Sequence, residues 1–142
     1  MIKFELVTLD GTKFAEDVYE VRLPTPDGEI GVFPHHMPLV SIASPGVVTL
    51  RRKQSDPDTL LEYFSINGGV IEILDNQIRV LVDEADRGED INEAEIQKAH
   101  DEAKRLRAEA KDRVSLAHAQ TLVDRTASQL KVAELRRRKR KH

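Results

Sequence analysis

Residues 85–99, ADRGEDINEAEIQKA, contain the point at which the spacing of apolar residues along the chain changes. Before this stretch apolar residues tend to alternate with polar ones, and after it they recur every three or four residues. Asn92 and Glu95 fit a helix-capping pattern, because an Asn side chain can accept from a backbone N–H of the first turn. Glu93 and Glu95 also suit the positive end of a helix. The stretch therefore predicts β structure before it and a helix that begins within it.

The residues after Asp90 form two apolar stripes of helical spacing. No Gly or Pro occurs after Asp90 in the sequence, so no residue forces a turn between the two helices. A bend within residues 110–116 is predicted, because Asp112 and Ser115 are weak helix formers that can cap a second helix. The two stripes are Ile96, Ala99, Ala103, Leu106 and Ala110, and then Ala119, Val123, Ala127, Leu130 and Glu134, with Leu122, Thr126 and Ala133 beside the second.

The contact between these helices is predicted to be weak. Nine alanines follow residue 90 and three precede it, and a buried Ala contributes far less than the ~1.5–3 kcal/mol of a buried Leu or Ile. The closed hairpin is therefore predicted to be only marginally favoured. A partner with a differential affinity of a few kcal/mol could open it into one extended rod.

The residues before Asp90 are predicted to form short strands separated by turns. Ile2, Phe4 and Leu6 lie at every second position, which buries one face of a strand. Asp10-Gly11 is a turn dipeptide that predicts a hairpin. Further strands are predicted at residues 18–23, 29–33, 39–43, 46–52, 60–66, 70–74 and 77–82. The predicted fold class is α+β, with an all-β sandwich or flattened barrel of about eight to ten strands at residues 1–86 and a two-helix antiparallel hairpin at residues 87–142.

The composition excludes some classes of protein and separates the two parts by charge. There is no Cys, so neither a disulfide framework nor a thiolate metal site can form. No apolar stretch approaches the ~20 residues of a membrane span, and no secretion signal is expected. Residues 1–90 hold 8 Lys+Arg against 17 Asp+Glu, a net charge of −9, while residues 91–142 hold 14 against 8, a net charge of +6. The basic part is predicted to meet an acidic surface.

No pattern of residues predicts an active site. The sequence has no phosphate-binding GxxxxGK[ST] loop, no GxGxxG, no HExxH and no Cys nucleophile. The five histidines lack the spacing of a metal site, so no metal is expected. The acidic run at residues 83–90 lacks the spacing of an EF-hand and is interpreted as a solvated linker. The chain is therefore predicted to be a non-catalytic partner protein.

The strongest charge feature is a run of six cations near the end of the sequence. An acidic protein surface is the favoured partner, while a solvated helix end and a nucleic acid remain as alternatives. A nucleic acid is the least favoured, because no aromatic residue after Phe64 is available to stack on bases. The six are Arg136, Arg137, Arg138, Lys139, Arg140 and Lys141.

Residues 28–39, GEIGVFPHHMPL, followed by SPGV at residues 44–47, resemble the GxxG(I/V)xPxHxPL…PG signature of the epsilon subunit of F-type, proton-translocating ATP synthases of bacteria. The NGGVIEI segment at residues 67–73, residues 78–82 and the ADRGED segment at residues 85–90 resemble that family's GG-containing strand and the entry to its helical domain. QLKVAEL at residues 129–135 resembles its last helix. The resemblance covers essentially the whole chain.

The resemblance implies a rotor subunit of the central stalk with no active site of its own. The β domain is then expected to pack on the gamma subunit, and a firm loop carrying Glu29 and His36 is expected to contact the c-ring. The helical arm is expected to contact the alpha and beta catalytic subunits and to hold back ATP hydrolysis, with Arg136 and the following cations against an acidic segment of beta. The membrane would be reached only through the complex, on the cytoplasmic face of the bacterial plasma membrane.

One motif of some family members is altered. Those members bind ATP in the folded arm through an (I/L)DxxRA sequence, and the aligned residues here place Asn92, Glu95 and Ile96 where that motif has Asp, Arg and Ala. An anion thus replaces the cation that would meet a phosphate. No cofactor is expected, although the cations Arg105 and Arg125 could attract ATP weakly.

The alternatives to a rotor subunit are a free-standing adaptor or nucleic-acid-associated protein and an enzyme of unfamiliar type.

Overall fold

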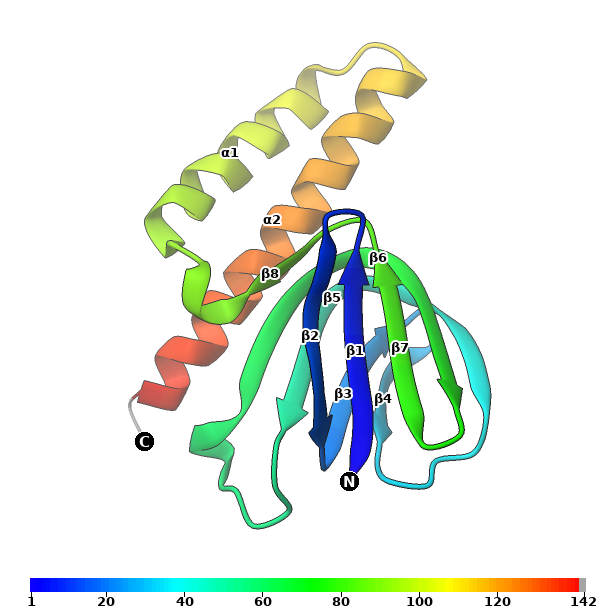
Figure 1. Ribbon diagram of the computed structural model, residues 1–142. Coiled ribbons are helices and arrows are strands. Elements are labelled where there is room, and N and C mark those ends of the chain that lie inside the picture. The colour runs from blue at the N-terminus through cyan, green and yellow to red at the C-terminus, as the bar shows by residue number, and fades with distance from the viewer. Residues whose placement is uncertain (141–142) are drawn as a thin grey trace.

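The computed structural model describes residues 1–140, in which an eight-stranded β domain is followed by two helices (Figure 1). The α+β fold is confirmed. Short 3-10 turns occupy Asp58–Leu60 and Gly88–Asp90. The strands are β1 Ile2–Thr8, β2 Gly11–Val18, β3 Glu20–Thr25, β4 Gly28–Val32, β5 Leu39–Arg51, β6 Glu62–Leu74, β7 Gln77–Val82 and β8 Ala85–Arg87, and the helices are α1 Glu93–Glu109 and α2 Arg113–Arg140.

The strands form one coiled sheet in the order β2-β1-β7-β6-β5-β3-β4, with β8 also paired to β6. All neighbours are antiparallel except β1 and β7, which run parallel. The ends of the order, β2 and β4, do not pair with each other, so the sheet wraps into a sandwich and does not close into a barrel. The predicted sandwich is therefore confirmed.

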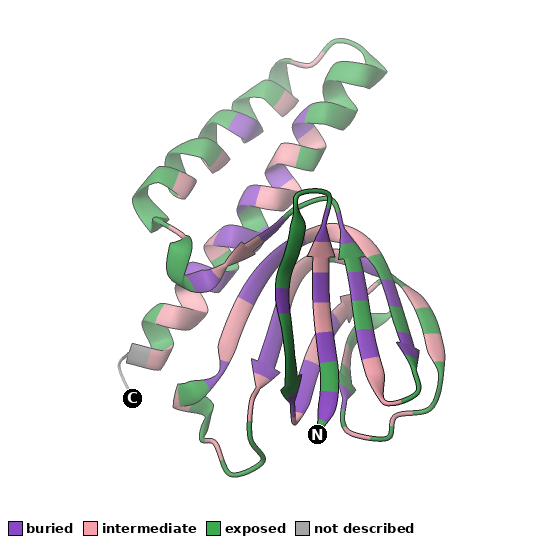
Figure 2. Ribbon diagram, viewed as in Figure 1, coloured by how far each residue is buried: buried purple, intermediate pink, exposed green. Residues whose placement is uncertain are grey.

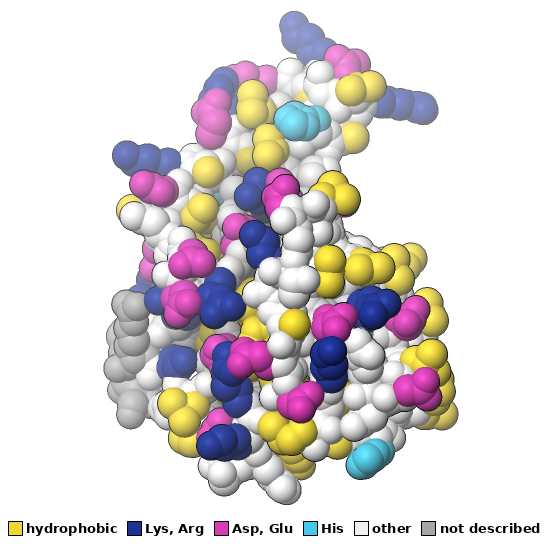
Figure 3. All heavy atoms as spheres, in the orientation of Figure 1, with side chains coloured by type: hydrophobic (Ala, Val, Ile, Leu, Met, Phe, Trp, Pro, Cys, Tyr) yellow, Lys and Arg dark blue, Asp and Glu magenta, His cyan; other side chains and the backbone are white. Residues whose placement is uncertain are grey.

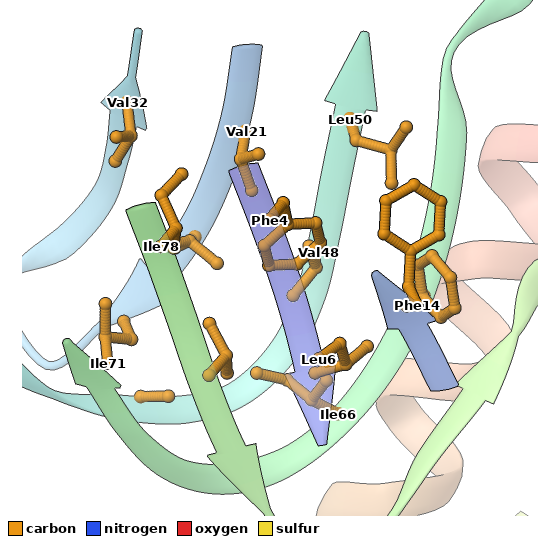
Figure 4. Close-up of a cluster of buried hydrophobic side chains, with 14 of the residues drawn as sticks. Phe4, Leu6, Phe14, Val21, Val32, Val48, Leu50, Ile66, Ile71 and Ile78 are labelled. Atoms are coloured by element: carbon orange, nitrogen blue, oxygen red, sulfur yellow. The ribbon is translucent and has the colours of Figure 1, made fainter. Parts of the chain in front are cut away.

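The inward face of the sheet forms a single apolar core. The alternation predicted for the first strand is confirmed, since Ile2, Phe4 and Leu6 are fully buried. Phe14 lies between two other rings, with its centroid 5.6 Å from that of Phe4 and 5.9 Å from that of Phe64. Figure 4 shows side chains from both layers of the sandwich meeting in this core.

Two pairs of predicted strands are in fact two continuous long strands. Residues 39–43 and 46–52 fall in β5, and residues 60–66 and 70–74 fall largely in β6. Pro45 and the pair Gly68-Gly69 bend these strands without ending them, because the register is the same on both sides of the bend, from Leu39↔Ile73 to Leu50↔Glu62. Both glycines have positive φ, at 82° and 154°, where residues with a side chain are strained.

The acidic run at residues 83–90 is not a solvated linker, and that interpretation was wrong. Its middle forms β8, which continues along β6 in the same register as β7. Ala85 and Gly88 are buried, and the Asp86 carboxylate accepts a hydrogen bond from the Gln129 side chain at 2.8 Å. Residues 85–87 form a strand because the edge of β6 beyond the end of β7 is free to pair with them.

The helices form the predicted hairpin. The Asn92 side chain accepts from the Glu95 backbone N–H at 3.2 Å and starts α1. The predicted bend is confirmed at residues 110–112, and the Asp112 carboxylate accepts from the Ser115 backbone N–H at 2.7 Å. Capping by these two side chains thus fixes where each helix begins.

Helix α2 lies between α1 and strands β5 and β6 (Figures 1 and 2). Ala119, Val123 and Thr126 are buried as the stripe predicts, but Ala127 is exposed, while Ser128 and Val132 are buried. Because α2 contacts a helix on one side and a sheet on another, its buried face is wider than one helical stripe and rotates along its length.

Candidate interaction surfaces

The outer face of the sheet carries a row of exposed apolar side chains. Ile42, Val70 and Leu81 are 64%, 46% and 48% exposed, and they lie opposite one another on β5, β6 and β7. Val7 of β1, which pairs with Leu81, extends the row. We name these four residues the outer apolar row. Exposed contiguous apolar patches of this kind mark interaction sites.

A row of charged residues borders the outer apolar row on the same face. Glu72 pairs with Arg79 across β6 and β7, and Arg79 lies opposite Glu5 of β1. The Lys3 ammonium, 3.1 Å from the Glu5 carboxylate, holds the pKa of that group below its ordinary value. Figure 3 shows a band of hydrophobic side chains across the upper part of the β domain, above side chains of both charges. The outer face of the sheet thus carries an apolar row and, beside it, a row of charged residues.

The predicted contact loop is held in place by hydrogen bonds. The His35 backbone N–H donates to the Asn76 side chain at 2.8 Å, and the Asn76 amide donates to the Met1 carbonyl at 2.9 Å. His36 is partly buried and its Nδ1 lies 2.6 Å from the Met37 carbonyl oxygen. Glu29 is exposed at the start of β4, so this strand separates Glu29 from His36. Glu29 thus belongs to the strand itself, and His36 belongs to the loop that follows it.

The predicted partner-binding cations contact other parts of their own chain. Arg136 donates to the Gly88 carbonyl oxygen, and Lys139 Nζ donates to the Leu61 carbonyl oxygen at 2.7 Å. Arg137 Nη1 lies 2.7 Å from the Glu93 carboxylate at the start of α1. Arg138 pairs with Glu134 on its own helix. Lys141 and the side chain of Arg140 lie outside the described structure.

A second group of polar contacts joins α2 to the β domain further from its end. Arg125 Nε lies 2.8 Å from the Glu84 carboxylate, and Arg125 Nη2 lies 3.8 Å from the Asp86 carboxylate. Gln129 donates to Asp86. We define the α2 clasp as Arg125, Gln129, Arg136, Arg137 and Lys139 with the groups that they contact, which are Glu84, Asp86, Gly88, Glu93 and Leu61.

A cleft of about 360 Å³ lies between the two helices. Its lining is mostly apolar and includes Ile96 and Leu106. His100 Nδ1 lies 2.7 Å from the Thr126 hydroxyl and joins the helices, and burial, followed by the nearby charge of Lys104, holds the pKa of His100 below its ordinary value. Among residues 1–140 there is no cluster of His, Asp and Glu suited to a metal ion.

The residues at the altered ATP-binding motif lie at the start of α1, and Arg125 lies at the cleft. Asn92 is occupied in capping α1, and Glu95 presents an exposed carboxylate in its first turn. Arg125, which lines the cleft, is already within ion-pair distance of Glu84 and Asp86. Phosphate recognition uses cations and N–H donors, and the Arg125 Nε–H has no hydrogen-bond acceptor among residues 1–140.

Within residues 1–140 neither helix combines the length and the apolar character that crossing a bilayer requires.

The chain is similar to known proteins in sequence and in fold. Residues 1–88 match the model of the ATP synthase delta/epsilon chain, beta-sandwich domain. The chain is 31% identical to the ATP synthase epsilon chain of Herpetosiphon aurantiacus over 137 residues, which cover 96% of both chains. It is 35% identical to that of Syntrophobacter fumaroxidans over 133 residues, 94% of this chain and 96% of that one. A chain of the cryo-EM structure of Euglena gracilis mitochondrial ATP synthase, OSCP/F1/c-ring in rotational state 1, shares the fold with a TM-score of 0.77 and 21% identity over 94% of this chain and 81% of its own.

Proposed function

The chain belongs to the ATP synthase delta/epsilon chain family, and we therefore propose that it is a non-catalytic rotor subunit of the central stalk of a proton-translocating ATP synthase. In this role it couples proton flow through the c-ring to ATP synthesis and restrains ATP hydrolysis with its helical arm. The observation that carries the proposal is the division of the molecule into a firm β domain with an exposed apolar face and a cationic helical arm.

The outer apolar row is the surface that we assign to the gamma subunit. A rotor subunit turns together with its partner, so the contact between them must be tight. Burying apolar area against a partner supplies affinity roughly in proportion to that area. The bordering charges of Glu72, Arg79 and Glu5 would fix the orientation of the partner. The face is exposed in the isolated chain and covered in the complex.

Val70→Asp is expected to weaken association with gamma by at least roughly thirtyfold, since it removes about 2 kcal/mol of apolar burial and places a carboxylate in the interface. Co-purification and titration with the cognate gamma subunit measure the effect. Val70 is 46% exposed, so the thermal unfolding temperature is expected to stay near that of the unsubstituted chain.

The control for this test is Val114→Asp, the same change at a residue that is 80% exposed near the turn of the hairpin. It should bind gamma normally. Equal binding by the Val70 variant would reject the assignment of the surface. The adaptor alternative predicts a different outcome again, in which the unsubstituted chain is recovered with a soluble protein or a nucleic acid and not with gamma and a c-ring in membranes.

We assign the c-ring contact to Glu29 and to the loop that carries His36. Glu29 is exposed at the edge of the sheet, and the hydrogen bonds of His35 and Asn76 stiffen the loop on the other side of β4. An exposed carboxylate and an imidazole suit the polar loops of a c-ring subunit. In this arrangement the chain lies at the cytoplasmic face of the bacterial plasma membrane and touches it only through the complex.

Glu29→Lys is expected to lower the rate of ATP synthesis at a given proton-motive force several-fold, because the reversed charge repels the group that Glu29 contacts. Inverted membrane vesicles that contain the complete complex allow the measurement. Asp17→Lys, on the exposed side of the edge strand β2, makes the same charge change away from this surface and should leave synthesis unaltered. Unaltered synthesis by the Glu29 variant would count against the contact.

We propose that the arm works without bound ATP, since Asn92 caps α1, Glu95 places an anion where the motif has a cation, and the charge of Arg125 is paired with that of Glu84. Titration of the full chain with Mg-ATP in a calorimeter is expected to give only heats of dilution. A saturable heat with one site per chain would show that the altered motif still binds the nucleotide. The variant with Asn92→Asp, Glu95→Arg and Ile96→Ala restores the motif and is the matched comparison.

A further inference from the structure

We propose that His36 meets the c-ring as a hydrogen-bond acceptor through its Nε2 atom, and that Asn76 is the residue that positions it. The inference rests on the proposed function, in which the loop that carries His36 contacts the c-ring. It adds the polarity of that contact, which requires a hydrogen-bond donor on the c-ring. It also assigns a role to Asn76, which belongs to the turn between β6 and β7.

The first support is the hydrogen bond that holds the imidazole of His36. Its Nδ1 atom lies 2.6 Å from the Met37 carbonyl oxygen. A carbonyl oxygen only accepts, so Nδ1 carries the hydrogen of this bond, and in a neutral imidazole the other ring nitrogen is then an acceptor. Among residues 1–140, Nε2 is not one of the buried side-chain atoms that lack a partner. Its lone pair is therefore accessible to a donor from outside the chain.

The other predicted contact residue has the same polarity. Glu29 is exposed, and an ionised carboxylate accepts hydrogen bonds and donates none. Both residues that we assign to the c-ring contact thus present acceptors. A partner surface that carries guanidinium, ammonium or amide N–H groups matches both of them.

The second support is the way in which Asn76 ties the loop to the rest of the β domain. Its side chain accepts from the His35 backbone N–H at 2.8 Å and donates to the Met1 carbonyl oxygen at 2.9 Å. Within the described part of the chain, the bond from His35 is the one side-chain hydrogen bond between residues 33–38 and another segment. Figure 1 shows the N-terminus, the β6–β7 turn and this loop at the same end of the β domain. Asn76 therefore anchors the residue that directly precedes His36.

The third support is the backbone conformation on both sides of this bond. Asp75 and Asn76 form the turn with φ of 52° and 59°, and His35 has a φ of 65°. Asn and Asp tolerate this left-handed region, whereas a His there is uncommon and persists where surrounding contacts fix it. The Asn76 backbone carbonyl is itself held by the Lys3 N–H at 3.3 Å. A well-anchored amide thus fixes an uncommon conformation next to His36.

Substitutions of His36 test the polarity of the contact. The amide of Gln reaches the position of Nε2 and accepts there, whereas Arg has donors only. His36→Gln is expected to keep most of the rate of ATP synthesis at a given proton-motive force. His36→Arg and His36→Ala should each lower it roughly three- to tenfold, the effect of losing one hydrogen bond. Inverted membrane vesicles with the complete complex, assayed above neutral pH so that imidazole is uncharged, give these rates.

Substitutions in the turn test the role of Asn76. Asn76→Gly removes both side-chain bonds and suits the left-handed backbone, whereas Asn76→Asp keeps an acceptor for the His35 N–H. The His35 amide of the full chain should exchange with solvent roughly threefold faster or more in Asn76→Gly and stay protected in Asn76→Asp. ATP synthesis should fall in Asn76→Gly and be retained in Asn76→Asp. Asp75→Gly, the same change at the exposed neighbouring turn residue, is the control and should alter neither measurement.

A double variant shows whether Asn76 acts through His36. In a chain with His36→Ala there is no imidazole left to position, so adding Asn76→Gly should lower synthesis little further. A full additional loss would mean that Asn76 only supports the fold, and would reject the positioning role. Unchanged exchange of the His35 amide in Asn76→Gly would reject it as well. Thermal unfolding identifies a variant that is misfolded, and the Gln and Arg variants of His36 then still decide the polarity.

The outcomes separate this inference from the proposed function. If His36→Ala lowers synthesis while His36→Arg keeps it, the contact with the c-ring stands and the acceptor role of His36 is wrong. An equal loss in the Gln and Ala variants would contradict the acceptor role in the same way. If His36→Ala leaves synthesis unaltered, the proposed contact of His36 with the c-ring fails, and the inference fails with it.

Discussion

Stopping the chain after Leu135 is expected to raise ATP hydrolysis by the assembled complex towards the rate of a complex with no arm. The deletion removes all six cations of the basic run. Exposed ion pairs contribute about 0.2–1 kcal/mol each, so losing six of them weakens the inhibitory contact by roughly a hundredfold. A reconstituted catalytic head, titrated with the full chain, with this truncation and with a chain stopped after Asp90, gives the three rates to compare.

The proposed inhibitory contact is electrostatic, so inhibition by the full chain should weaken as ionic strength rises and the charges are screened. Inhibition by the truncated chain should be small and nearly independent of salt. The control is a full chain with Lys98→Gln, Lys104→Gln and Lys111→Gln, three exposed positions on α1 and at the bend, which should still inhibit. Full inhibition by the truncated chain would reject the assignment of the basic run.

Gly69→Ala is expected to destabilise the β domain by more than about 4 kcal/mol, which places it among the most damaging substitutions available in the chain. Its φ is 154°, and a Cβ atom there would overlap the carbonyl oxygen of Leu81 and lie 2.8 Å from Val82 Cγ1. β6 and β7 pair directly at this point, Gly69 opposite Val82. The side chain can be accommodated only if the two strands separate. Urea unfolding followed by circular dichroism measures the loss.

Gly28→Ala is the matched control for this prediction. Gly28 also has a positive φ, 118°, but no atom lies within 4 Å of the Cβ that alanine would add. Its cost should be the backbone strain alone, about 1–3 kcal/mol. If the two variants lose the same stability, the close contact between β6 and β7 is not what requires glycine at position 69. Since Leu81 belongs to the outer apolar row, a folded Gly69 variant should also bind gamma less tightly.

Several elements follow from short-range patterns in the sequence. The starts of α1 and α2 were predicted from Asn92 and Asp112, whose side chains cap the first turn three residues away. The first strand and the hairpin at Asp10-Gly11 were predicted from alternation and a turn dipeptide, both of which act over a few residues. The family resemblance was predicted from the segment at residues 28–39 and is confirmed by relatives that match nearly the whole chain.

Other elements differ from the prediction because a distant partner decides them. Pro45 lies within β5 because β3 pairs with that strand only from Thr49 onward, which leaves one edge of β5 without a partner beside the proline. The middle of the acidic run forms β8 because β6 has an edge there that β7 does not cover. The buried face of α2 was wider than its pattern because two different surfaces cover it.

The sequence alone determined the order of β domain and helical arm, the starts of the helices, the separation of charge and the family, because periodicity, capping and motifs are properties of neighbouring residues. Only the tertiary structure decided which apolar side chains remain outside, since Ile42, Val70 and Leu81 meet through strand register. It also decided where the cations of α2 bind. The acceptor of Lys139 is 78 residues away, and no local pattern relates a side chain to a backbone carbonyl at that separation.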